Sequence, residues 1–188
     1  MAELTETIHE AVEHGHSGSP LGNIVALAVA LAATFMALAS VKDRNITLRM
    51  NQAEAKAIDT WNYYQAKSMK QNLSEATLDQ MTAVGGAQTQ LDRYKKQVER
   101  YDHEKAEVKA EAEGYEKKYE ALNGQHDLFD LSDAAMSVAI ALLGVTALTR
   151  KRWLLGVAFV FLAMGAFFGV AGFMNMPIHP EHLVSWLA

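Results

Sequence analysis

The sequence predicts an all-α integral membrane protein with three transmembrane helices and a long extramembrane antiparallel coiled-coil hairpin. Three stretches are almost free of charge: 21–41, 134–149 and 153–174. By contrast, residues 42–133 are densely charged, with both signs mixed. In the second half of that stretch, apolar side chains recur at alternating steps of three and four residues, the spacing of a coiled-coil seam.

Residues 1–20 form an acidic polar tail that carries histidines and no lysine or arginine. Imidazole binds zinc, copper and nickel, so these histidines are weak candidate ligands for a divalent metal ion. Their spacing matches no structural metal site, and a solvated tail is the preferred interpretation. We therefore assign no metal and no cofactor. The candidates are His9, His14 and His16.

Residues 21–41 are predicted to form the first transmembrane helix, because about 20 apolar residues cross the hydrocarbon core of a bilayer. Gly22, Ala26 and Ala30 recur every four residues on one side of this helix. Small residues in such a row let helices approach closely in lipid, so the row is a predicted packing face. The alternative is that the helix is simply rich in alanine.

Residues 42–133 are predicted to form a hairpin whose turn lies at 85–86, where two glycines interrupt the helical pattern. The two arms are nearly equal in length, as an antiparallel pair requires. Lys105 is the one charged side chain at a seam position, where it extends outward or sets the register. The predicted seam of the second arm comprises Leu91, Tyr94, Val98, Tyr101, Val108, Tyr115, Tyr119 and Leu122.

The first arm has a second face with apolar and aromatic side chains, which predicts a second packing partner. Trp and Tyr often anchor protein interfaces, so this face is interpreted as a contact with another copy of the chain or with a different protein. The alternative is packing within the hairpin. The predicted interaction surface comprises Ile58, Trp61, Tyr64, Gln65, Ser68, Met69 and Leu73.

Two further membrane helices are predicted at 134–149 and 153–174, joined by a basic turn, and residues 175–188 form a carboxyl-terminal tail. Gly165 and Gly169 stand four residues apart in the third span, where small residues favour close helix packing. Asp130 and Asp133 precede the second span and are expected to lie at the headgroups.

The stretch from Trp61 to Ser68 reads Trp-Asn-Tyr-Tyr-Gln-Ala-Lys-Ser and follows Asp59 by two residues. Together with 93–96 and 148–153, it resembles the signature of an uncharacterised bacterial membrane protein family, domain of unknown function (DUF) family 4337. The resemblance covers nearly the whole chain. It implies a multi-pass protein of the bacterial inner membrane, and it brings no activity or catalytic residue.

The orientation in the membrane follows from two opposing signals. The short basic turn at 150–152 favours a cytoplasmic location for that turn, which places the hairpin in the periplasm. Lys42, Arg44 and Arg49 beside the first span favour the opposite orientation. We predict a periplasmic hairpin, with a cytoplasmic one as the alternative.

Composition and the absence of recognisable motifs narrow the range of functions that the chain can have. The chain has no cysteine and a formal net charge of −5, which exclude thiol chemistry and disfavour nucleic-acid binding. No nucleophile and base pattern is recognisable, so we expect no enzyme. The prediction is a membrane-anchored scaffold or accessory protein whose hairpin mediates self-association, the binding of an unidentified membrane or periplasmic protein, or both. The alternative is an oligomeric channel lined by the first transmembrane helix.

Overall fold

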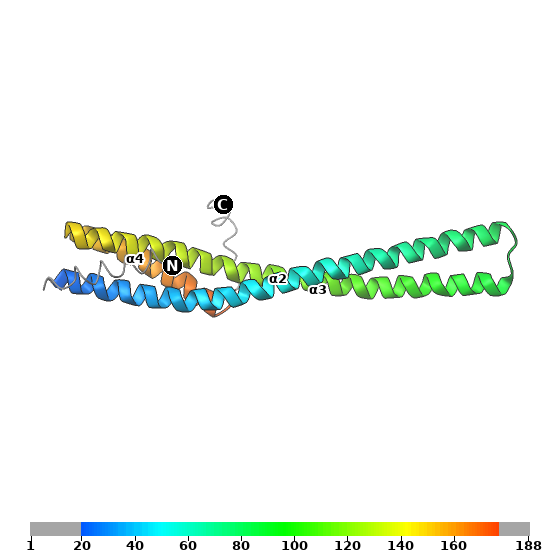
Figure 1. Cartoon of the computed structure of the whole chain (residues 1–188), viewed down its shortest axis with the longest axis horizontal. Helices are drawn as coiled ribbons and strands as arrows, with labels where there is room; N and C mark the ends of the chain where they lie inside the picture. The colour runs from blue at the N-terminus through cyan, green and yellow to red at the C-terminus, as the bar shows by residue number, and fades with distance from the viewer. Residues whose placement is uncertain (1–19, 177–188) are drawn as a thin grey trace. The chain divides into compact units, whose positions relative to one another are not determined.

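The computed structural model describes residues 20–176, which form three α-helices and no strand. The helices are α2 (Pro20–Ala83), α3 (Gln88–Thr149) and α4 (Arg152–Phe173) (Figure 1). The predicted all-α fold is confirmed for this part of the chain. Each helix contains a segment long and apolar enough to cross a membrane. The histidine candidates in the amino-terminal tail and the predicted carboxyl-terminal tail from 177 onward lie outside the described residues.

The chain reverses between α2 and α3 at the predicted glycine pair. Gly85 has φ of 71°, a left-handed conformation in which a side chain would be strained. The amide of Gly86 donates to the carbonyl of Met81 at 2.8 Å, so it satisfies one of the carbonyls left free where α2 ends. A Cβ at Gly86 would lie 3.1 Å from the Met81 carbonyl oxygen, so glycine at both positions permits a tight turn between the two long helices.

The chain divides into two compact units, and we describe each by itself. The hairpin unit, Leu48–Ala121, pairs the second part of α2 with the first part of α3. Contacts across it join Trp61 to Glu116 and Lys67 to Glu104. The later residue on α2 contacts the earlier residue on α3, so the two arms run antiparallel. Small or β-branched residues are buried between the arms: Ala53, Ala57, Val108 and Ala112.

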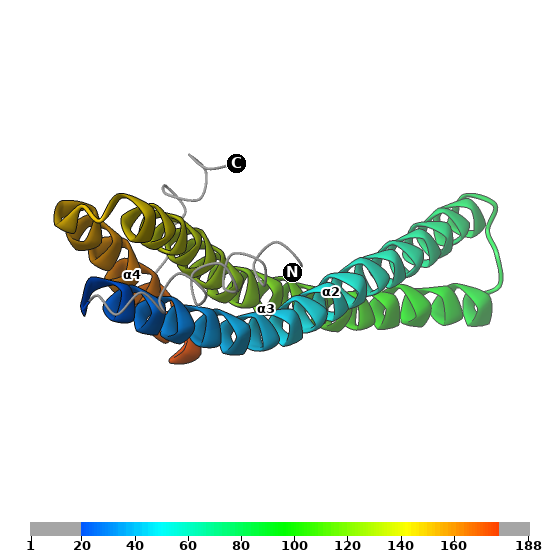
Figure 2. The same ribbon diagram turned by 60° about the vertical axis from the view of Figure 1, so that its left-hand side comes forward.

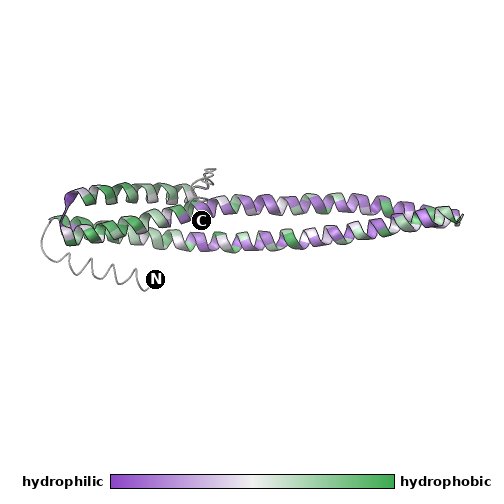
Figure 3. Cartoon of the chain, turned by 90° about the horizontal axis from the view of Figure 1, so that it is seen from above, coloured by the Kyte–Doolittle hydropathy of each residue, from purple (hydrophilic) through white to green (hydrophobic). Residues whose placement is uncertain are grey.

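The other unit is a three-helix bundle made by residues 20–47 and 122–176, in which α4 lies beside α2 and α3 (Figures 1 and 2). Apolar residues are concentrated in this unit, whereas hydrophilic residues predominate in the hairpin (Figure 3). Each helix contributes to one buried core, because an apolar helix face must be covered by a neighbour. Core residues include Val25, Val29, Met36, Met136, Ile140, Leu143 and Ala158.

Candidate functional site

The predicted hairpin seam lies on the side of α3 that faces the first arm. Val108 is buried, and the other seven predicted residues are half-buried. Lys105 stays at the seam, where its ammonium donates to Gln71 Oε1 at 2.8 Å. A charged side chain at this position therefore has a specific partner on the facing helix, which is one way to fix the register of two helices.

A second polar contact between the arms is the ion pair of Lys67 with Glu104. The hydrogen bond to Glu104 is the main reason why the pKa of Lys67 is raised above its usual value, and the same bond lowers the pKa of Glu104. The Lys67 ammonium also lies 5.0 Å from the centre of the Tyr63 ring. Both residues of the pair therefore remain charged at neutral pH.

The structure divides the predicted interaction surface of the first arm into two groups. Trp61, Tyr64 and Ser68 are half-buried, and Trp61 Nε1 donates to Glu116 Oε1 on the second arm at 2.7 Å. Trp61 and Tyr64 also stack edge to face, with ring centres 5.4 Å apart. The other group points outward and is exposed: Ile58, Gln65, Met69 and Leu73.

Three residues of the outward group, Ile58, Gln65 and Met69, belong to a longer surface that we name the outer face of the hairpin. Its side chains recur at alternating steps of four and three residues, which places them on one line of an α-helix. All of them are exposed and none is charged, although the hairpin is rich in charge. Ile58 and Met69 are 56% and 73% exposed. The outer face comprises Ile58, Asn62, Gln65, Met69, Asn72 and Ala76.

The same spacing occurs on the exposed side of α2 within the three-helix bundle. Ala30, one of the predicted packing residues, lies on this side, whereas Gly22 and Ala26 are half-buried. The buried side of α2 is instead formed by Val25, Ala28, Val29, Ala32 and Met36. The predicted row therefore lies between the two sides. The outer face of the bundle comprises Asn23, Leu27, Ala30, Thr34, Ala37 and Val41.

The predicted glycines of the third span pack against the other two helices. A Cβ at Gly165 would lie 2.8 Å from Met136 Cγ, and one at Gly169 would lie 2.5 Å from two ring carbons of Phe35. Ser132 Oγ fills the remaining space and donates to the carbonyl of Gly165 at 2.7 Å. Both glycines are needed for close approach, as small residues are in other membrane helix pairs.

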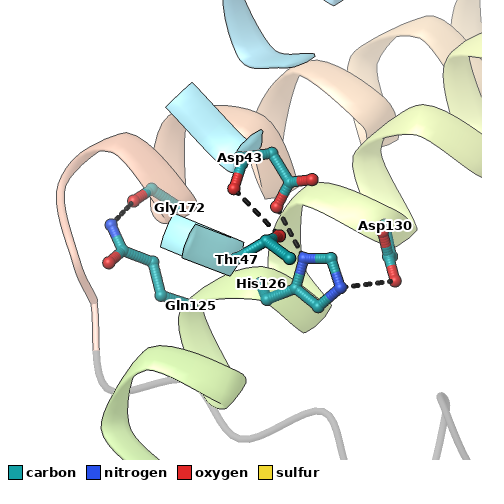
Figure 4. A network of polar contacts seen from close by, with 6 residues as sticks. All are labelled: Asp43, Thr47, Gln125, His126, Asp130 and Gly172. Carbon is teal, nitrogen blue, oxygen red and sulfur yellow. Dashed lines mark hydrogen bonds and ion pairs between the residues drawn. The ribbon is translucent and has the colours of Figure 1, made fainter. Parts of the chain in front are cut away.

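A polar cluster lies at one end of the bundle, at the last turn of α4. The His126 ring on α3 lies between two carboxylates: Nδ1 is 2.6 Å from Asp43 Oδ1 on α2, and Nε2 is 3.6 Å from Asp130 Oδ2 (Figure 4). The neighbouring Gln125 donates to the carbonyl of Gly172 at 2.7 Å, which links α3 to the end of α4. Asp43 thus comes from α2 and His126 and Asp130 from α3, and Gln125 connects α3 to α4 beside them.

Burial alone would lower the pKa of His126, because it disfavours the charged imidazolium. The hydrogen bond to Asp43 and the charges of Asp130, Asp43 and Asp127 outweigh that effect, and the net pKa is raised. Beside the cluster lies a cavity of about 140 Å³, lined by Met36, Ala39, Ser40, Asp43, Phe129, Asp130, Ser132 and Asp133.

Sequence reasoning placed His126 in the continuation of the seam of α3 and named neither His126 nor Asp43 as a candidate ligand. The four-residue step from His126 to Asp130 was a usable signal, because residues at this spacing share one side of a helix. Asp43 lies 83 residues from His126, so its position opposite the imidazole depends on how α2 and α3 are aligned. That alignment is not readable from either segment alone.

Comparison with known proteins gives one match. The profile of a protein family described as Domain of unknown function (DUF4337) matches residues 21–175. This range includes almost all of the described residues and both units. No curated protein and no solved structure matches the chain.

Proposed function

The chain belongs to the family described as Domain of unknown function (DUF4337), and we propose that it is a non-enzymatic, membrane-anchored scaffold or accessory protein that associates with further copies of itself. In this proposal the three apolar helices cross the bacterial inner membrane. The hairpin lies outside the lipid on the periplasmic side and binds a protein partner there. The outer faces of α2 mediate self-association.

The observation that carries the proposal is the absence of charge along the exposed outer face of the hairpin. Copies inserted with the same topology are parallel, so a symmetric pair brings each residue close to its own counterpart. Identical charges would repel there, whereas Asn62, Gln65 and Asn72 carry amides that both donate and accept hydrogen bonds. Ile58 and Met69 add apolar contact at the same spacing.

The outer face of the bundle supports the same arrangement within the membrane. Ala30 and Ala37 are small and exposed, so a second α2 can approach their backbone closely. Asn23 can also hydrogen-bond to a neighbouring copy in lipid. A self-associating α2 would therefore use the same spacing in both units.

The second candidate function is an oligomeric channel lined by α2, which the polar side chains on the outer face of the bundle favour. Asn23 and Thr34 are exposed on α2, and a ring of such helices would present them to a central axis. Ion conductance of the purified protein in planar bilayers distinguishes the two. The scaffold predicts no conductance above the empty bilayer, whereas a channel predicts unitary currents.

Co-expression of two differently tagged copies tests self-association. We expect the second tag to be recovered when membranes are solubilised in a mild detergent and purified through the first tag. Copies expressed separately and mixed after solubilisation control for association in detergent alone. Recovery of one tag only, from membranes that contain both proteins, would contradict the proposal.

A further inference from the structure

The polar cluster at the end of the bundle has the composition of a metal site. One ligand atom from each of Asp43, His126 and Asp130 lies within 4.8 Å of the other two. The group combines one imidazole with two carboxylates, from two facing helices. Metal sites in helix bundles are built in this way, from side chains that project toward one another from neighbouring helices.

The spacing between the two ligands on α3 suits a single ion. His126 and Asp130 stand four residues apart on one helix, and their nearest atoms, Nε2 and Oδ2, are 3.6 Å apart. Two tetrahedral ligands that each lie about 2.1 Å from zinc are about 3.4 Å from each other. The two side chains therefore need little movement to bind the same ion.

Asp43 fixes the orientation that such binding requires. When Nδ1 of His126 carries a proton, it donates to Asp43 Oδ1 at 2.6 Å, which leaves Nε2 as the nitrogen that faces Asp130. Metal-binding histidines commonly donate their other ring nitrogen to a carboxylate in this manner.

The charge around the cluster favours a cation. Three carboxylates line the adjoining cavity, those of Asp43, Asp130 and Asp133, and its lining includes no lysine or arginine among the described residues. One imidazolium offsets at most one of these negative charges. A divalent ion binds the neutral imidazole and offsets two of the three negative charges where the apolar core of the bundle begins.

We propose that His126 and Asp130 bind a divalent transition-metal ion, with Zn²⁺ as the representative, and that Asp43 holds the imidazole in the orientation for binding. An imidazole ligand selects against Ca²⁺ and Mg²⁺, which prefer oxygen alone, and zinc accepts both His nitrogen and Asp oxygen. The bound ion fixes the imidazole that donates to Asp43 on α2, near the last turn of α4. It therefore stabilises the end of the bundle independently of self-association.

Binding of Zn²⁺ to the full-length protein tests this inference. The protein is purified without a polyhistidine tag, treated with a chelator and titrated with ZnCl₂ by calorimetry. We expect His126→Gln and Asp130→Asn each to remove one equivalent of bound Zn²⁺ per chain, or to weaken that equivalent at least about a hundredfold. Because both variants keep the tail histidines, any binding by the tails cancels in the comparison.

His103→Gln is the matched control, because His103 is an exposed histidine on the same helix. It is expected to bind as many Zn²⁺ ions as the wild type, with the same affinity. Asp130 is also exposed, so its replacement tests the site even if His126→Gln fails to fold. Equal stoichiometry and affinity in the wild type and Asp130→Asn would overturn the proposal.

Discussion

Gly169→Ala is expected to destabilise the three-helix bundle by roughly 1–3 kcal/mol, the usual cost of overpacking a close contact. The added Cβ would lie 2.5 Å from the Phe35 ring and 2.8 Å from Ser132 Oγ. The Phe35 ring also packs edge to face against the Phe173 ring, with ring centres 6.3 Å apart, so Phe35 cannot move without disturbing this second contact. Unfolding of the purified protein by sodium dodecyl sulfate, followed by circular dichroism, measures the change.

Gly156→Ala is the control for this substitution. Gly156 lies on the same helix, and a Cβ there would meet nothing within 4 Å. Alanine is preferred over glycine in a helix by about 1 kcal/mol, so this variant is expected to be unchanged or slightly more stable. Equal stability of the two variants would mean that α4 does not pack against Phe35 as described.

Met69→Glu is expected to weaken self-association at least about tenfold. Met69 lies near the middle of the outer face of the hairpin and is 73% exposed, so its replacement leaves the contacts within the hairpin intact. In a symmetric pair the substitution brings two carboxylates together and removes apolar contact, and both effects oppose association. Energy transfer between donor-labelled and acceptor-labelled copies, diluted into increasing amounts of lipid, gives the change in association constant.

Gln52→Glu introduces the same charge at an exposed position of α2 that lies off the outer face. It is expected to associate as strongly as the wild type. If Gln52→Glu and Met69→Glu weakened association equally, the added charge rather than the proposed face would be responsible.

The sequence was sufficient for the coarse architecture because each of its signals is local. Long uncharged segments indicate helices able to cross a membrane, and a glycine pair marks the reversal between α2 and α3. The close contacts of Gly165 and Gly169 also followed from local spacing, since few other reasons place two glycines four residues apart in an apolar helix.

What the sequence could not supply depends on the alignment of one helix against another. The predicted row through Ala26 lies beside the buried face of α2. Spacing alone could not show this, because alanine suits either side of a membrane helix and does not reveal which side is covered. Trp61 was assigned to an outer contact, yet its indole reaches Glu116 on the facing arm. Asn62 and Asn72 were overlooked because they are polar, although their spacing matches that of Ile58 and Met69.

The central claim is that copies of the chain associate through the outer face of the hairpin, and cysteine scanning tests it most directly. The natural chain has no cysteine, so single cysteines at each position from 62 to 73 can be oxidised in native membranes without background. We predict that disulfide-linked dimers form most efficiently at 62, 65, 69 and 72, with minima at 63, 67 and 70. Dimers that peak at the second set of positions, or equal yields at all positions, would contradict the claim.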